Sequence, residues 1–227
     1  MQHDVLILAD PDAVAEAAAE ILVGAADAAI EVSGRFVLAL AGGSTPRELH
    51  ARLARADQIE RVPWDRTWIL FVDERCVEPD HPDSNFRMAH ETLLDHVPVP
   101  AGQVLRIEAE NPQASRAAHF YEERLRELFP DDVLPGIDLA LLGMGTDGQT
   151  ASLFPGTDAL DVDDRWVTAS YLADRGEWRV TMTVPALSAA HQIVVLVTGE
   201  PKAERVAEVF GEQLSDAVSP IERVLPI

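Results

Sequence analysis

Runs of apolar residues alternate along the chain with segments in which apolar residues recur every three or four positions. Continuous runs are typical of strands buried on both faces, and spaced patterns are typical of amphipathic helices. The runs predict strands at residues 5–8, 35–41, 67–72, 137–142, 166–169, 179–184 and 192–197. The spaced patterns predict helices at residues 11–31, 46–55, 84–94, 113–129 and 201–210, with a short helix starting in 150–154.

This alternation predicts an α/β fold, a single domain over residues 1–227, with a mainly parallel sheet and helices on both faces. We expect Thr45 to cap the helix at 46–55 and Ser84 to cap the helix at 84–94. In such sheets ligands bind at the carboxyl ends of the strands. The chemistry should therefore lie in the segments that follow the predicted strands.

Composition narrows the class of protein. The chain has 227 residues and one cysteine, Cys76, so it has no internal disulfide. No apolar run is long enough to cross a bilayer, and residues 1–4 do not begin a secretion signal. We therefore expect a cytoplasmic protein with no membrane partner.

The net charge of −21 comes from 18 basic and 39 acidic residues. Such a surface repels nucleic acid and anionic membranes, so neither is an expected partner. It also repels an anionic ligand unless cations gather locally. Lys202 is the only lysine of the chain, so it is either a chance surface residue or one kept for its chemistry. The acid excess has two alternative explanations: the host has a salty cytoplasm, or the protein is an ordinary acidic protein.

The segment after the strand at 35–41 has the composition of a phosphate-binding loop. Gly42 and Gly43 allow close approach of the backbone, and Ser44 and Thr45 add hydroxyl donors at the start of a helix. The spacing fits neither a Walker loop nor the dinucleotide fingerprint. A tight turn with a helix cap would explain the same residues.

Charged residues follow the next strand. Asp73 and Glu74 are candidate acid/base groups, and Arg75 is a candidate anion ligand. The alternative is a solvated strand end. Arg179 begins a later predicted strand, and Lys202 lies where a strand meets a helix. We predict that Arg75, Arg179 and Lys202 form the local positive pocket.

A second glycine-bearing segment, residues 143–150, follows the strand at 137–142. Asp147 and Gln149 are the candidates there to orient a sugar hydroxyl or a water. The glycine spacing argues against nicotinamide binding. The histidines form no cluster with metal-ligand spacing, so no metal site is expected.

Five segments resemble the 6-phosphogluconolactonase family, within the group that includes glucosamine-6-phosphate deaminase. They read LALAGGSTP, FVDERCVEPDHPDSNFRMA, LLGMGTDGQTASLFPG, RVTMTVPAL and VTGEPKA, in order from residue 38 to residue 203. The resemblance implies a three-layer α/β/α sandwich with a modified Rossmann-like sheet. It implies hydrolysis of 6-phosphoglucono-δ-lactone to 6-phosphogluconate, in the pentose phosphate pathway, without metal or cofactor. Gly43, Ser44 and Thr45, with Arg75, Arg179 and Lys202, would hold the phosphate and the substrate.

One position departs from the family pattern. Where the family's glycine loop reads Asp-Gly-His and supplies the general base, this chain has Gln149. An amide cannot take a proton at physiological pH. Either another base serves, with Asp73, Glu74 and Asp147 as candidates, or activity is reduced, or the position has been substituted. A sugar-phosphate binding protein without catalysis and an amino-sugar phosphate deaminase or isomerase are the alternative functions. The sequence leaves the oligomeric state open.

Overall fold

A five-stranded parallel sheet with the strand order β4-β2-β1-β5-β8 forms the centre of the fold. The computed structural model describes residues 4–211 and 218–225. The strands are β1 (Phe36–Leu40), β2 (Thr67–Phe71), β4 (Val104–Leu105), β5 (Leu139–Gly143) and β8 (Gln192–Leu196). Every residue of β1 is buried, which accounts for its uninterrupted apolar sequence FVLAL.

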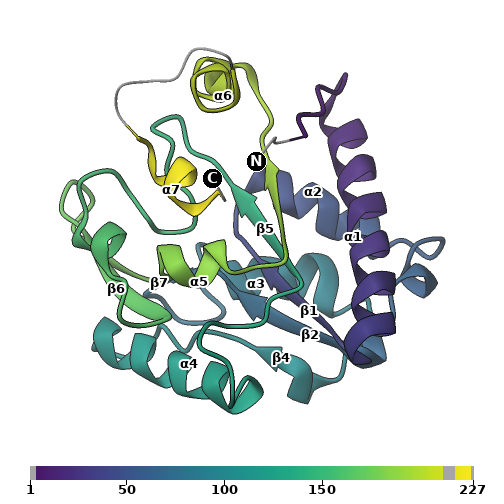
Figure 1. Ribbon diagram of the computed structural model, residues 1–227, viewed down its shortest axis with the longest axis horizontal. Helices are drawn as coiled ribbons and strands as arrows, with labels where there is room; N and C mark the ends of the chain where they lie inside the picture. Colours follow the sequence, from purple (N-terminus) through teal and green to yellow (C-terminus); the bar gives the residue numbers. More distant parts are fainter. Residues whose placement is uncertain (1–3, 212–217, 226–227) are drawn as a thin grey trace.

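Helices cover both faces of this sheet (Figure 1). The long helix α1 (Pro11–Ser33) packs beside α2 (Ser44–Leu53), and α4 (Ala114–Leu128) lies on the other side. Helix α1 begins where the Asp10 carboxylate accepts a hydrogen bond from the Ala13 N–H at 2.8 Å. It ends at Gly34, whose φ of 75° suits glycine.

The remaining helices are short. They are α3 (Asn85–Ala89), the π-helix η3 (His90–Leu94), α5 (Val184–Ser188), α6 (Ala203–Phe210) and α7 (Pro220–Val224). Single 3-10 turns occur at η1 (Ile59–Arg61), η2 (Trp64–Arg66), η4 (Ala101–Gln103), η5 (Asp158–Asp161) and η6 (Glu200–Lys202).

A second, antiparallel sheet has the order β3-β7-β6. Its strands are β3 (Asp73–Arg75), β6 (Val167–Leu172) and β7 (Glu177–Met182). Val72 joins the two sheets, because its N–H donates to Leu40 O at 3.0 Å and its carbonyl accepts from Met182 N–H at 2.8 Å. The charged segment that starts at Asp73 is therefore the first part of the second sheet.

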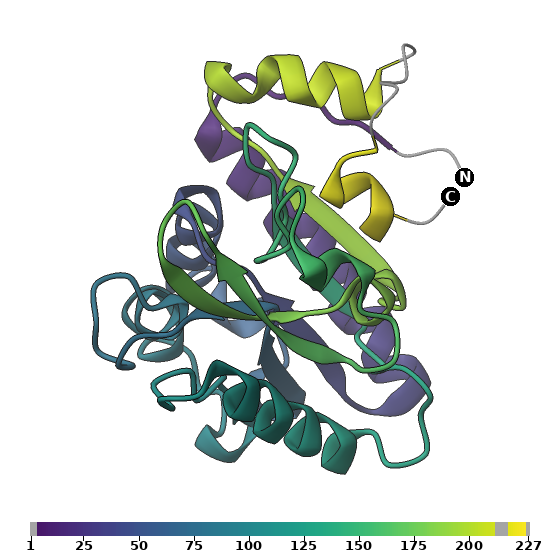
Figure 2. The ribbon, with the colours of Figure 1, turned by 90° about the vertical axis from the view of Figure 1, so that its left-hand side faces the viewer.

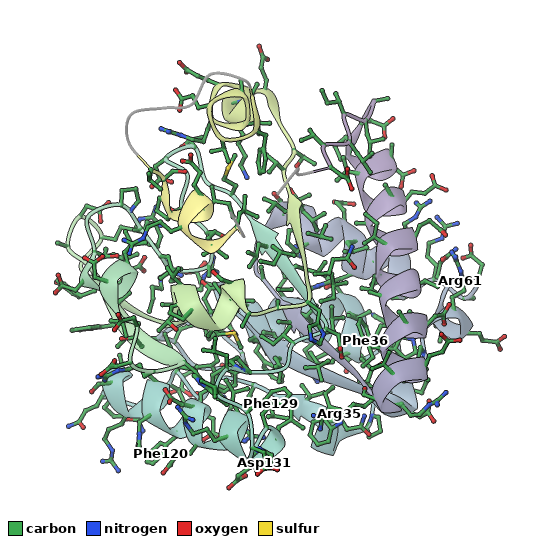
Figure 3. All side chains as sticks on the ribbon, in the orientation of Figure 1. Arg35, Phe36, Arg61, Phe120, Phe129 and Asp131 are labelled. Atoms are coloured by element: carbon green, nitrogen blue, oxygen red, sulfur yellow. The ribbon has the colours of Figure 1, made fainter. Side chains whose placement is uncertain are left out.

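The amino and carboxyl ends of the parallel strands are covered by different parts of the chain. At the amino end, the Arg35 guanidinium lies 5.3 Å from the centre of the Phe129 ring and closes the core (Figure 3). At the carboxyl end, the chain leaves β8 and enters α6, and α7 lies nearby (Figure 2). The loops that carry the candidate chemistry belong to this carboxyl edge.

The predicted fold class, a three-layer α/β/α sandwich with a mainly parallel sheet, is confirmed. The long helices and the strands β1, β2, β5 and β8 occur where predicted, within a few residues, whereas β4 has no predicted counterpart. Ser84 caps α3, because its hydroxyl accepts a hydrogen bond from the Arg87 N–H.

Three local predictions are wrong. Residues 5–8 form no strand, and their side chains are exposed, with Ile7 at 93%, because no neighbouring strand of the described residues pairs with them. Helix α2 starts at Ser44 after Gly43, so Thr45 is not the cap. Residues 150–154 form a turn closed by a bridge between Thr150 and Leu153 instead of a helix.

The antiparallel sheet is a further difference from the predicted fold. The segments at 166–169 and 179–184 were predicted as strands of the alternating α/β pattern, but they form a hairpin with each other. Within residues 4–211 and 218–225, no helix is both long and apolar enough to cross a membrane.

Candidate functional site

The first glycine loop, residues 41–46, connects β1 to α2. Gly43 has a φ of 115°, a backbone conformation that favours glycine. Gly43 and Ser44 are exposed at the start of α2, where the first helical N–H groups have no partner within the helix. Thr45 is buried, and its hydroxyl lies 2.7 Å from the Thr198 hydroxyl. The loop thus offers backbone donors and a hydroxyl at a helix N-terminus, which suits an anion.

Gly42 lies directly against the side chain of Asn85. A Cβ atom at Gly42 would stand 1.8 Å from Asn85 Oδ1, closer than any real contact. Position 42 therefore requires glycine because of this close approach, and the position of Asn85 sets the position of the first glycine loop.

The Asp73 carboxylate lies next to Asn85 and is 6% exposed. Its Oδ1 accepts a hydrogen bond from Asn85 Nδ2 at 3.0 Å, and its Oδ2 accepts one from Ser152 Oγ at 2.6 Å. Asp73 therefore joins the segment behind the first glycine loop to the segment that follows residues 143–150.

The Glu74 carboxylate points to the opposite face of β3 and caps α3. It accepts hydrogen bonds from the N–H groups of Arg75, Asn85 and Phe86 and from the hydroxyl of Ser84. Burial raises the pKa of Glu74, and it outweighs the three backbone hydrogen bonds, which lower that pKa. The lone pairs of this carboxylate are engaged within the protein.

Arg75 and Arg179 are cross-strand partners in the antiparallel pair of β3 and β7. Side chains alternate between the faces of a strand, so both arginines lie on the face that carries Asp73. Arg179 pairs with Glu177 at 2.5 Å, and Arg75 donates to the Asp83 carbonyl. Among the described residues, the buried Nε atoms of both arginines have no hydrogen-bond partner. Two arginine side chains on one face of the sheet could together bind an anion.

The second glycine loop, residues 143–150, closes on itself. The Gly145 N–H donates to Gln149 O at 2.9 Å, and the Gln149 N–H donates to Asp147 Oδ1 at 3.0 Å. A Cβ atom at Gly145 would stand 2.5 Å from Gln149 Cγ, so the tight turn requires glycine there. Asp147 is exposed, and its Oδ2 has no hydrogen-bond partner in the part of the chain that the structure describes.

Lys202 is on the turn η6 after β8, beside the segment that contains Thr198. The hydrogen bond between Thr198 and Thr45 ties this segment to the start of α2. Lys202 is half-buried, and burial lowers the pKa of its ammonium group. No carboxylate of the described residues lies within ion-pair distance of Lys202.

Residues 9–227 match the family described as glucosamine-6-phosphate isomerases/6-phosphogluconolactonase. The chain belongs to this family. A 6-phosphogluconolactonase of Nostoc sp. is 37% identical over 229 residues, which cover 100% of this chain and 92% of that protein. A 6-phosphogluconolactonase of Treponema pallidum is 37% identical over 199 residues, which cover 87% of this chain and 82% of the relative.

Solved structures of the glucosamine-6-phosphate isomerase/6-phosphogluconolactonase family share the fold. The 6-phosphogluconolactonase of Leishmania guyanensis is 29% identical, with a TM-score of 0.87 over 99% of this chain and 92% of that chain. A monomeric glucosamine-6-phosphate deaminase is 20% identical, with a TM-score of 0.81 over 98% of this chain and 92% of its own. The second match shows the fold alone.

The family segments meet through contacts that residue type alone did not predict. Asn85, Ser152 and Thr198 were not among the predicted site residues, although each lies in one of the quoted family segments. Their hydrogen bonds connect the strand ends to one another. Groups of three histidine, cysteine, aspartate or glutamate side chains that could hold a metal ion do not occur among residues 4–211 and 218–225.

Proposed function

We propose that this chain hydrolyses 6-phosphoglucono-δ-lactone to 6-phosphogluconate, the lactone hydrolysis step of the pentose phosphate pathway. Similarity at 37% identity over the full chain to a protein named 6-phosphogluconolactonase carries the proposal. We further propose a cytoplasmic location, in keeping with the single cysteine.

The phosphate group of the substrate is proposed to bind at the first glycine loop. Gly43 lets the backbone approach it, Gly42 holds the loop against Asn85, and Ser44 and Thr45 belong to the helix start that favours an anion. Arg75, Arg179 and Lys202 supply the charge that the acidic protein otherwise lacks. The cross-strand pairing of Arg75 with Arg179, which puts both side chains on one face of the sheet, supports this role.

The lactone ring is proposed to face the second glycine loop, with Asp147 as the proton acceptor. Both oxygens of Asp73, and those of Glu74, already accept hydrogen bonds inside the protein. Asp147 is exposed and has one oxygen without a partner among the described residues. Of the three carboxylates, Asp147 is therefore the one that a water molecule can reach.

The reaction then follows ordinary ester hydrolysis. Asp147 takes a proton from water as the water oxygen bonds to the lactone carbonyl carbon. The bond between this carbon and the ring oxygen breaks, and protonated Asp147 returns the proton to the departing ring oxygen. Gln149 orients the water or the ring through its amide, because it cannot hold the proton itself. The product acid loses its proton to solvent.

The test is consumption of freshly generated 6-phosphoglucono-δ-lactone by the pure protein, compared with the spontaneous rate. We expect acceleration, and the Asp147→Asn variant should lose most of it. Asp65→Asn is the matched control. It changes an exposed carboxylate just before the amino end of β2, away from the loops at the carboxyl ends of the strands, and it should behave as wild type. A rate equal to the spontaneous one with pure wild-type protein would refute the proposal.

Gln149 favours a second candidate function, a sugar-phosphate binding protein that does not turn over its ligand. This candidate predicts saturable binding of 6-phosphogluconate without acceleration of hydrolysis. Release of ammonia from glucosamine 6-phosphate would instead reveal a deaminase. We expect no such release.

A further inference from the structure

We propose that Asp73 is a positioning residue that fixes the first glycine loop relative to the second. The inference rests on the proposed function, in which each loop holds one end of the same substrate. A carboxylate that links the loops sets the distance between the phosphate site and the reacting carbon.

The link is a continuous chain of contacts. Asn85 touches Gly42 of the first glycine loop and donates its amide to Asp73 Oδ1 at 3.0 Å. Asp73 Oδ2 accepts from Ser152 Oγ at 2.6 Å, and Ser152 comes three residues after Gln149. The two loops are far apart in sequence, and these side chains connect them.

The burial of Asp73 argues for a positioning role and against direct proton transfer. Asp73 is 6% exposed, Asn85 is 2% exposed and Ser152 is 1% exposed. A carboxylate this enclosed, with a side chain donating to each of its oxygens, is largely shielded from solvent. Asp73 therefore acts through the groups that it holds.

The strand pairing of the second sheet reinforces the link. The Ser152 N–H donates to Thr181 Oγ1 at 3.3 Å, and Thr181 is the cross-strand partner of Asp73. Ser152 is thus held by both strands of the pair that also presents Arg75 and Arg179. A shift of Asp73 moves the arginines, the first glycine loop and the second glycine loop relative to each other.

Hydrogen exchange of backbone amides tests the link without any need for activity. Ser152→Ala should speed exchange in residues 42–45 as well as near its own position, and Asn85→Ala should speed exchange in residues 145–149. Thr67→Val is the matched control, because it removes a buried hydroxyl hydrogen bond to Pro63 O at the amino end of β2. It should leave exchange in both loops unchanged. Changes confined to the mutated segment in both variants would overturn the proposal.

Kinetics separate positioning from proton transfer. In Asp73→Asn the new amide oxygen still accepts from Asn85, and the new amide group donates to the Ser152 hydroxyl, so the link is kept. This variant should retain most of its kcat. Asp73→Ala should lose kcat/KM on the order of a hundredfold, the scale for a misplaced substrate. The same loss in Asp73→Asn as in Asp73→Ala would identify Asp73 as the proton acceptor and overturn the proposal.

The two measurements keep this inference distinct from the proposed function. If wild-type protein does not hydrolyse the lactone, the proposed function fails, and coupled hydrogen exchange still decides whether Asp73 links the loops. If wild-type protein is active but exchange is uncoupled, the link fails and the proposed function stands.

Discussion

Arg75 and Arg179 are cross-strand partners, so their side chains leave the antiparallel sheet next to each other on the same face. Like charges at such a position repel each other unless an anion lies between them. The adjacent Glu177 pairs with Arg179 and offsets part of this charge. In the proposed function an anionic ligand binds this pair, and the repulsion between the two charges destabilises the free protein.

Arg179→Met should weaken binding of 6-phosphogluconate roughly tenfold to a hundredfold, because hydrogen bonds to charged groups contribute about 1.5–3 kcal/mol. The melting temperature of the free protein should stay the same or rise, because a like-charge contact is removed. Calorimetric titration and thermal unfolding measure the two effects. Arg55→Met, at an exposed arginine paired with Asp57, should change neither. A large loss of stability without loss of binding would contradict the assignment.

Gly42→Ala should abolish tight binding of 6-phosphogluconate, because the new Cβ atom would stand 1.8 Å from Asn85 Oδ1 and displace the first glycine loop. Gly24→Ala is the control, since Gly24 lies in α1, where a Cβ atom would meet no neighbouring element of the described residues within 4 Å. The Gly24→Ala substitution should raise the free energy of unfolding by up to about 1 kcal/mol, because alanine has a higher helix propensity than glycine. Equal ligand affinity in Gly42→Ala and wild type would show that the loop is not set by Asn85.

Protein stability should fall as the pH falls from about 6.5 to about 4, because of His50. Burial lowers the pKa of His50 from 6.5 to about 4, so the unfolded chain binds a proton in this window and the folded chain does not. The contribution is of the order of 3 kcal/mol, at 1.36 kcal/mol per pKa unit.

Comparison of pH-dependent unfolding isolates this contribution. His50→Asn should flatten the stability curve between these pH values, and the exposed His119→Asn should leave it unchanged. The same slope in His50→Asn and wild type would rule out His50 as its source.

The sequence predicted the layers of the fold because buried strands such as β1 carry an unbroken apolar run, and α1 carries an N-cap, an N-terminal proline and a C-terminal glycine. It did not predict the second sheet. Strand β3 has only the three charged residues Asp73–Arg75, and its strand character comes from pairing with β7. Likewise, residues 5–8 have strand composition but no partner strand among the described residues.

The candidate site could be predicted at the level of segments but not of contacts. Residue types at the strand ends indicated Arg75, Arg179 and Asp147. The separation of Asp73 from Asp147 depends on burial and on hydrogen bonds from Asn85 and Ser152. Those contacts join residues up to 79 positions apart, which no local pattern encodes.

Replacement of Gln149 tests whether the second glycine loop faces the reacting carbon. Gln149→His places an imidazole beside Asp147, and general base assistance is commonly worth on the order of a hundredfold to ten-thousandfold in rate. We expect a rise in kcat with little change in KM. An unchanged kcat would argue against a second glycine loop that faces the reacting carbon.

The most direct test compares the rate of 6-phosphoglucono-δ-lactone hydrolysis in wild-type protein and in Asp147→Asn. The affinity of both proteins for 6-phosphogluconate is measured as well and should be equal. We expect hydrolysis above the spontaneous rate in wild type and a loss on the order of a hundredfold or more in Asp147→Asn. Hydrolysis at the spontaneous rate in wild type, or full activity in Asp147→Asn, would contradict the proposed function.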